Sequence, residues 1–300
     1  MNPYGHMMEL LGRYHAAGAD GERLANEMMV SGYNVVRDFV RMEVGEPWVW
    51  TNAMAEFYRA SDAFIYELLV WHHRPERIQA RAEMARHIRE LFPDGAKILF
   101  FGDGIGYDCA TVALRNPGAV ATSFEFEGFS SAFAARMIED LGLGRRVEAV
   151  HRPERLTKES YDAVACFDVL EHVPDPPKMI AEIGSHLRPG GHAFISEAFD
   201  VVNPLRPTHL ASNLRFAGRT IALFERRGLT YTGQVARRIL HFEKRSASRM
   251  PGRKAGLKLK RRVAGLLSEF RFKRLYADGD VDLAGAISGE RVAADRTCSP

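Results

Sequence analysis

The chain has 300 residues, of which 46% are hydrophobic and 26% charged, and this ordinary globular composition excludes a disordered, collagen-like or low-complexity protein. The length predicts one large domain with an appendage, or two domains. The net charge of +3 is unevenly spread, because residues 244–274 hold twelve lysines and arginines against the one acid Glu269, so the remainder of the chain is acidic.

Residues 1–92 have the apolar spacing of helices. Phe57, Phe64 and Leu68 stand seven and four residues apart, which places them on one face of a helix. The sequence Phe92-Pro93-Asp94-Gly95 then breaks the pattern. We therefore predict a helical N-terminal region that ends near residue 92.

From residue 96 the apolar runs shorten to the length of strands. Five of them, each followed by a helix-like stretch or a turn, lie at 97–101, 119–125, 147–150, 163–167 and 192–196. Two more candidates, at 229–235 and 238–244, follow a predicted helix near 219–227. The alternation predicts an α/β fold: a doubly wound, mostly parallel, seven-stranded sheet with an N-terminal helical extension.

A glycine-rich turn follows the first of these strands. It reads Gly102-Asp103-Gly104-Ile105-Gly106, and such a turn between a strand and a helix brings backbone N–H groups close to a ligand. Glu125 ends the next strand about twenty residues on, where an acid can hold the two hydroxyls of a ribose. Glu127 faces the same way if the register differs by two residues, so it remains the alternative.

The residue after the turn separates two classes of ligand. A dinucleotide-binding loop needs a third glycine two residues further on, where a pyrophosphate lies against the helix. Because the bulky Tyr107 stands close to that place, we expect a nucleoside without phosphates. S-adenosylmethionine is such a molecule.

Two further motifs stand at matching distances behind the glycines. They are Tyr161-Asp162-Ala163-Val164-Ala165-Cys166-Phe167-Asp168-Val169-Leu170-Glu171-His172-Val173 and Leu187-Arg188-Pro189-Gly190-Gly191. With the glycine turn, they resemble the class I S-adenosylmethionine-dependent methyltransferases, in the branch that includes the ubiquinone- and menaquinone-pathway enzymes. The resemblance covers roughly residues 90–240.

The resemblance implies the class I methyltransferase fold and S-adenosylmethionine as the cofactor. It assigns cofactor binding to Gly102, Asp103, Gly104, Gly106, Glu125, Phe126, Phe167 and Asp168. Together with the helical spacing before residue 92 and the basic composition after residue 244, it divides the chain into a helical lid and substrate region at 1–92, a Rossmann-like cofactor domain at 93–245, and a basic amphipathic arm with a frayed tail at 246–300. The lid would contact the acceptor through some of its aromatic rings.

Two positions depart from the family pattern. The family often has an acid in the strand before the glycines, where this chain has Phe100. An aspartate usually follows the third strand and contacts adenine, whereas here the sequence is Val150-His151-Arg152-Pro153-Glu154. Recognition of adenine then falls to a backbone N–H group or to Glu154.

For the catalytic residues, the resemblance places Glu171 and His172 at the mouth of the acceptor pocket, and His209 follows the fifth strand in a loop that faces it. A base is needed only if the acceptor is a hydroxyl or a protonated amine, and His172 and His209 are the candidates, with His72 or His73 of the lid as alternatives. In the family the histidine of this motif often only organises the loop. We predict no metal site, since no carboxylate or cysteine cluster accompanies His72 and His73.

The basic arm has an apolar helical stripe through Leu259, Val263, Leu266 and Phe270. We expect it to pack on its own chain or on a second subunit of a homodimer; contact of residues 254–274 with nucleic acid or an anionic membrane is the alternative.

Three functions are therefore open. We predict an S-adenosylmethionine-dependent methyltransferase that acts on a small-molecule acceptor, at oxygen or nitrogen. The alternatives are a methyltransferase for RNA or a peptide held by the basic arm, and a non-catalytic cofactor-binding protein. Its three cysteines form no CxxC pair, and its apolar stretches are far shorter than the roughly 20 residues of a membrane span. We expect a cytoplasmic location.

Overall fold

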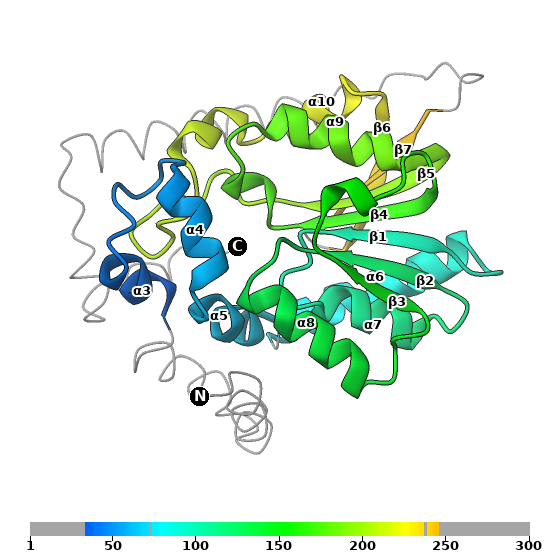
Figure 1. The fold of residues 1–300 in the computed structure, drawn as a ribbon. Helices are drawn as coiled ribbons and strands as arrows, with labels where there is room; N and C mark the ends of the chain where they lie inside the picture. The colour runs from blue at the N-terminus through cyan, green and yellow to red at the C-terminus, as the bar shows by residue number, and fades with distance from the viewer. Residues whose placement is uncertain (1–33, 73, 237–238, 246–300) are drawn as a thin grey trace.

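The computed structural model describes residues 34–72, 74–236 and 239–245 of the chain (Figure 1). Seven strands in these ranges form one sheet in the order β3-β2-β1-β4-β5-β7-β6. Their bounds are β1 Lys97–Phe101, β2 Val120–Phe124, β3 Val147–Val150, β4 Tyr161–Phe167, β5 Leu187–Ser196, β6 Leu229–Ala236 and β7 Ile239–Lys244. The neighbours pair in parallel, except that β7 runs antiparallel to both β5 and β6. The predicted seven-stranded α/β sheet is confirmed.

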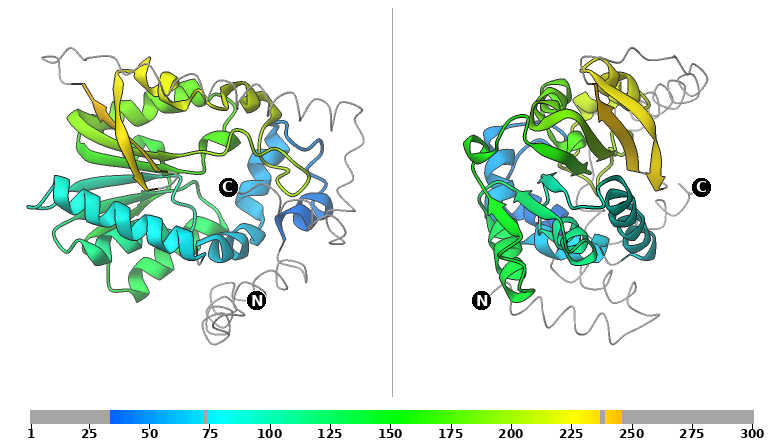
Figure 2. Two further views of the ribbon diagram at one scale, coloured as in Figure 1. Left: turned by 180° about the vertical axis from the view of Figure 1, so that it is seen from behind. Right: turned by 90° about the vertical axis from the view of Figure 1, so that its right-hand side faces the viewer.

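Helices cover both faces of the sheet (Figure 2). Those in the described ranges are α3 Val35–Arg41, α4 Asn52–Ala60, α5 Ala63–His72, α6 Pro75–Leu91, α7 Tyr107–Arg115, α8 Phe129–Asp140, α9 Pro176–His186 and α10 Thr220–Glu225. On one face α9 and α10 bury residues such as Ile180 and Phe224 against the sheet. On the other face α6 and α7 bury Met84 and Val112. No helix among these residues is both long and apolar enough for a bilayer crossing.

The strand order positions the ligand-binding edge. Strand β1 lies between β2 and β4, so the chain leaves β1 toward one side of the sheet and returns to its other side with β4. In parallel sheets, ligands bind outside the carboxyl ends of the strands at such a reversal. The glycine turn follows β1 directly and therefore lies at this edge.

Two strands begin earlier than predicted, β4 at Tyr161 rather than at residue 163 and β5 by a wider margin. Strand β5 begins at Leu187 rather than at residue 192, and its pairing with β4 includes a register shift between Tyr161 and Ala163. At Gly191 a Cβ atom would lie 3.1 Å from the backbone oxygens of both Tyr161 and Asp162. The glycine thus lets the strand continue past the irregularity, where sequence patterns indicated a turn.

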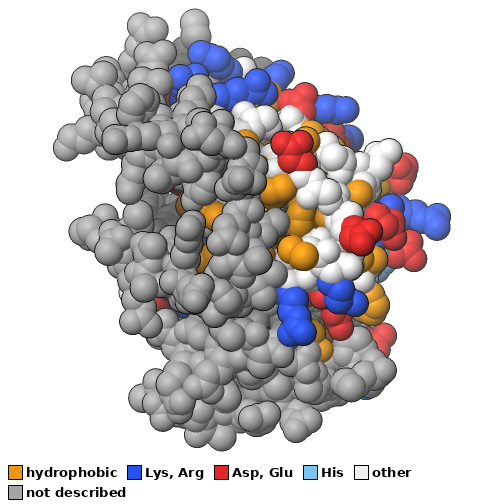
Figure 3. All heavy atoms as spheres, turned by 90° about the vertical axis from the view of Figure 1, so that its left-hand side faces the viewer, with side chains coloured by type: hydrophobic (Ala, Val, Ile, Leu, Met, Phe, Trp, Pro, Cys, Tyr) orange, Lys and Arg blue, Asp and Glu red, His pale blue; other side chains and the backbone are white. Residues whose placement is uncertain are grey.

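The N-terminal helices form a small core of their own. Phe39, Met54 and Phe57 are buried together between α3 and α4. Helix α5 joins this unit to the sheet domain, because Ile65 and Leu69 pack against the glycine turn through Ile105. Hydrophobic side chains also lie on the outer face at the α3 side of the molecule (Figure 3). The predicted helical region is confirmed within the described residues, while residues 1–33 and the arm at 246–300 lie outside them.

A cluster of three histidines lies between α6 and the sheet. His192 Nδ1 is 2.8 Å from His241 Nε2, and the ring of His87 stands edge-on to His241 with 5.0 Å between centroids. Burial, with the neighbouring His192 and His87, lowers the pKa of His241 to about 3. Burial also lowers the pKa of His192, with Arg188 adding to the shift and Glu243 and Asp162 opposing it. Burial lowers the pKa of His87 as well, with Arg86 adding to the shift and Glu90 opposing it. These imidazoles are therefore neutral in the folded protein near pH 7.

This cluster predicts a loss of stability in acid. Below the ordinary histidine pKa of about 6.5 the unfolded chain takes up protons that folded His241 does not, so the free energy of unfolding falls with falling pH. We expect wild type to lose stability relative to His241→Phe, whose ring can keep the stacking on Phe194, between about pH 7 and pH 5. Urea unfolding across that range measures the difference, and parallel curves for the two proteins would contradict it.

Candidate functional site

The glycine turn is held open by its backbone conformation. Gly104 has a φ of +56°, in the left-handed region that favours glycine. A Cβ atom placed there would have one protein neighbour within 4 Å, the Cδ1 atom of Leu68 on α5 at 2.8 Å. The space above Gly104 is thus bounded by the end of a flexible side chain, which leaves room for a ligand to approach the backbone.

Glu125 follows β2 and turns back onto this loop. Its Oε2 accepts a hydrogen bond of 2.9 Å from the Gly104 N–H, and its Oε1 accepts one of 2.9 Å from the Phe126 N–H. Burial raises the pKa of Glu125, while these two N–H groups lower it. Glu127 is exposed. Of the two acids that the sequence left open, the structure brings Glu125 to the glycine turn.

The Asp103 side chain is buried and does not face the space above the glycine turn. Its buried carboxylate accepts from the Ser123 hydroxyl at 2.7 Å and from the Cys109 N–H at 3.4 Å. Burial, with the nearby Asp108, raises its pKa well above the ordinary range. The side chain therefore ties the loop to β2 and α7, and only the backbone of Asp103 lies along the turn.

Asp168 joins the helical region to the end of β4. It has a φ of +53°, and its carboxylate lies 3.0 Å from the Arg77 guanidinium and accepts from Trp71 Nε1 at 3.3 Å. Ser196, at the end of β5, donates to its other oxygen at 2.9 Å. Helices α5 and α6 are thus fixed over the carboxyl ends of the strands.

The turns after β2 and β3 contain an exposed ring, and a histidine instead of an acid follows β3 directly. Phe126 is 59% exposed beside Glu125, and His151 Nδ1 lies 3.2 Å from the Glu125 carbonyl oxygen. Glu154 is exposed in the turn Pro153–Arg155. Phe100, which replaces the acid before the glycines, is 1% exposed and part of the core of the α6 face. Phe167 is partly buried and packs against the same core.

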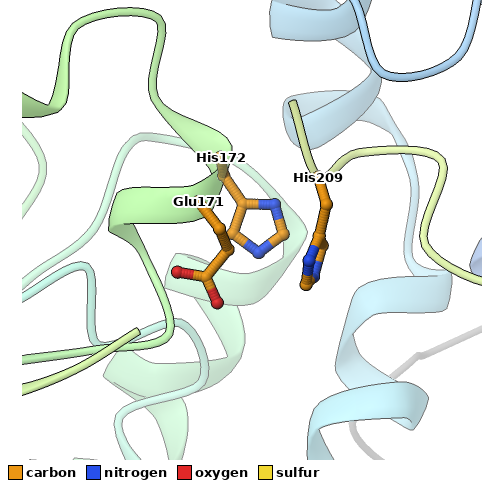
Figure 4. A group of neighbouring side chains, drawn as sticks. All are labelled: Glu171, His172 and His209. Atoms are coloured by element: carbon orange, nitrogen blue, oxygen red, sulfur yellow. The ribbon is translucent and has the colours of Figure 1, made fainter. Parts of the chain in front are cut away.

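A second group of polar side chains lies beyond the end of β4. Glu171 and His172 belong to the 3-10 turn Leu170–His172, and His209 comes from the loop after β5 (Figure 4). The rings of His172 and His209 stand edge-on with 4.6 Å between centroids. Tyr58 on α4 reaches the same group, with its Oη 2.8 Å from His172 Nδ1. The two histidines singled out from the sequence are therefore neighbours.

Burial fixes the charge of these groups. It lowers the pKa of His172 to about 4 and that of His209 well below the ordinary value, so both imidazoles are neutral at pH 7. It raises the pKa of the Tyr58 hydroxyl, so that group is not ionised. Two neutral imidazoles can accept protons or donate lone pairs.

His72, the alternative base from the lid, is engaged elsewhere. Its backbone oxygen accepts a 2.9 Å hydrogen bond from Arg81, which also contacts its ring and the Asp108 carboxylate. The ring stacks on Tyr107 with 5.3 Å between centroids. His72 therefore braces α5 and α6 against α7, and His73 lies outside the described residues. The sequence singled out Tyr58 and Trp71 only as members of the aromatic groups of the lid, and it missed Arg77. The partners of these three residues are about a hundred residues away and give no spacing signal.

Comparisons with known proteins fit this geometry. Residues 70–246 match the family model described as a methyltransferase domain. Among curated proteins, the chain is 35% identical over 114 residues to the ubiquinone biosynthesis O-methyltransferase of Photobacterium profundum, covering 37% of this chain and 46% of that protein. The enzyme of the same name from Xanthomonas axonopodis pv. citri is 33% identical over 106 residues, covering 35% and 44%. The chain thus spans less than half the length of these relatives.

Solved structures give a more distant likeness. One is the 1,6-didemethyltoxoflavin-N1-methyltransferase of Burkholderia thailandensis with 1,6-didemethyltoxoflavin and S-adenosylhomocysteine bound. It is 18% identical, with a TM-score of 0.46, and the match covers 64% of this chain and 87% of that one. An O-methyltransferase family protein from the same organism is 16% identical, with a TM-score of 0.44 and coverage of 62% and 61%.

Proposed function

The chain belongs to the methyltransferase-domain family, and on that premise we propose that it transfers a methyl group from S-adenosylmethionine to a small-molecule acceptor, at oxygen or nitrogen. The observation that carries the proposal is the hydrogen bond from the Gly104 N–H to the Glu125 carboxylate. It lies at the carboxyl end of β1, beside the reversal of the strand order between β1 and β4. A carboxylate in this place can accept from both hydroxyls of a ribose. The names of the curated relatives favour oxygen as the methylated atom.

The residues present fit this cofactor at three points. Glu125 and the glycine backbone suit the ribose, and the exposed ring of Phe126 suits stacking on adenine. Arg77, paired with Asp168 at the end of β4, is a cation for the carboxylate of the methionine part. The bound cofactor supplies an electrophilic methyl group on a sulfonium.

The protein's own part in the reaction is alignment and control of a proton. The nucleophilic atom of the acceptor needs to stand about 3–3.5 Å from the methyl carbon. His172 and His209 are neighbours beyond the carboxyl end of β4, and both are neutral. Either can therefore take the proton of an acceptor hydroxyl. Tyr58 brings the lid to this point, which supports a role of the N-terminal helices in holding the acceptor.

The alternative acceptors are RNA or a peptide held by the basic arm. We expect a chain that ends at Ser246 to keep both its affinity for S-adenosylmethionine and its turnover of a small acceptor, because the cofactor residues all precede residue 200. The measurement is methyl transfer from labelled S-adenosylmethionine to a metabolite extract, compared with RNA and peptide substrates, by the full and the shortened chain at low and high salt. If the full chain methylates RNA at low salt and the shortened chain does not, the macromolecular alternative is favoured.

The third alternative, cofactor binding without catalysis, predicts affinity for S-adenosylmethionine with no product from any of these acceptors.

We further propose a cytoplasmic location, which the buried free thiols of Cys109 and Cys166 support, because unpaired cysteines are typical of a reducing compartment.

A further inference from the structure

Glu171 is a buried acid that lacks a hydrogen-bond partner within the described residues. Its side chain belongs to a residue that is 1% exposed, and both carboxylate oxygens are buried without a partner. The N–H groups of Glu171 itself and of Ala198 lie nearby but form no hydrogen bond with it, and the neighbouring acid Asp168 adds negative charge. A buried polar group is normally paired, and a carboxylate without a partner is strongly disfavoured. The position therefore indicates a partner that supplies positive charge.

His209 presents a second unpartnered atom to the same place. It is 6% exposed, and its Nδ1 is buried with no hydrogen-bond partner in the described part of the chain. We assign its proton to Nε2, which leaves the Nδ1 lone pair free.

His172 completes the group. Its Nδ1 lies 3.2 Å from the Thr208 carbonyl oxygen, which can only accept, and 2.8 Å from the Tyr58 hydroxyl oxygen, which can accept as well as donate. We therefore assign the proton to Nδ1 and the free lone pair to Nε2. Figure 4 shows the imidazole of His172 between the Glu171 carboxylate and the ring of His209. One ligand atom from each of the three residues lies within 4.8 Å of the others. Two imidazole lone pairs and one carboxylate therefore converge.

We propose that Glu171, His172 and His209 bind one divalent transition-metal ion, with Zn²⁺ as the best match. Ligand atoms about 2.0–2.2 Å from such an ion stand roughly 3.3 Å apart, so small rotations of the three side chains close the present spacing. Imidazole nitrogens suit Zn²⁺, Co²⁺, Ni²⁺ and Fe²⁺, whereas Mg²⁺ and Ca²⁺ favour all-oxygen sites. Ligand histidines commonly bond a carbonyl through the other nitrogen, as His172 does here with Thr208.

The role of the ion rests on the proposed function, although its binding does not. An ion at this place lowers the pKa of an acceptor hydroxyl bound to it, and the proton leaves to water. The S–CH₃ bond of the cofactor then breaks as the O–CH₃ bond forms, and the sulfonium becomes a neutral thioether. In this version His172 and His209 act as metal ligands instead of bases. The sequence pattern predicted no metal because the ligands are Glu171-His172 and a histidine 37 positions later.

The test uses the full-length chain without a histidine tag, stripped with a chelator and titrated with Zn²⁺ or Co²⁺ alone. We expect one equivalent of Zn²⁺ to be retained through dialysis, a visible absorption band for the Co²⁺ form, and a rise in melting temperature with Zn²⁺. Glu171→Gln keeps the shape of the side chain, and we expect it to weaken binding by at least about tenfold to a hundredfold, as does His209→Asn.

His87→Gln is the matched control, because it removes a histidine of the other cluster. It should retain one equivalent of metal. A wild-type chain with no retained Zn²⁺ and no Co²⁺ band overturns the site, and so does equal loss of metal in His87→Gln and Glu171→Gln. Because neither S-adenosylmethionine nor an acceptor is present, the result is separate from the proposed methyl transfer. Circular dichroism shows whether each variant is folded, and Glu171→Asp, which keeps the charge and shortens the reach, provides intermediate affinity if Glu171→Gln does not fold.

Discussion

Glu125→Ala is expected to weaken the binding of S-adenosylmethionine by about tenfold to a hundredfold. A hydrogen bond to a charged acceptor contributes about 1.5–3 kcal/mol, which corresponds to that range of affinity. The substitution also removes the acceptor that fixes the Gly104 N–H, so the turn beneath the ligand loses its support. Isothermal titration of both proteins with the cofactor measures the change.

Glu127→Ala is the matched control for this result. The two acids stand two residues apart, but Glu127 is exposed and Glu125 faces the glycine turn. We expect the affinity of Glu127→Ala to equal that of wild type. Equal affinities for Glu125→Ala and wild type, or a loss confined to Glu127→Ala, would mean that the ribose is held elsewhere.

Gly104→Val should abolish cofactor binding. A branched side chain at this position enters the space through which a ligand approaches the backbone, where Leu68 is the only neighbour within 4 Å among the described residues. The backbone strain is expected to cost about 1–3 kcal/mol, because a β-branched residue at a φ of +56° is rare. We expect a folded protein with a lower melting temperature and no measurable affinity for S-adenosylmethionine.

Gly142→Val separates the effect on the ligand from the effect of strain. Gly142 has a similar φ of +67°, a Cβ atom there meets nothing within 4 Å, and it follows α8 at the opposite edge of the sheet. It should lower the melting temperature by a comparable amount and leave cofactor affinity unchanged. Retained affinity in Gly104→Val would refute the assignment of the turn.

Much of the fold could be predicted because strand length and apolar content are local properties. The pattern over Lys97–Phe101 and Val147–Val150 reproduces β1 and β3. The predicted start of β5 at residue 192 was wrong, because a proline followed by two glycines normally indicates a turn. Here the pairing with β4 makes Pro189 and the two glycines part of the strand. Tertiary contact decided that boundary, and the sequence pattern does not contain it.

The candidate site divides in the same way. Gly104, Glu125 and His172 stand within five residues of strand ends, so their motifs locate them. The contacts of Tyr58 with His172 and of Arg77 with Asp168 join helices before the sheet to loops about a hundred residues later. The direction of the Asp103 carboxylate also depended on packing, since a loop residue between two glycines can face either the ligand or the core.

Titration of S-adenosylmethionine into the full-length chain tests the central claim most directly. The arrangement of Gly104, Glu125 and Phe126 predicts one bound molecule per chain, displaced by S-adenosylhomocysteine. A folded chain that binds neither molecule would contradict the assignment of this site and the methyl transfer proposed from it.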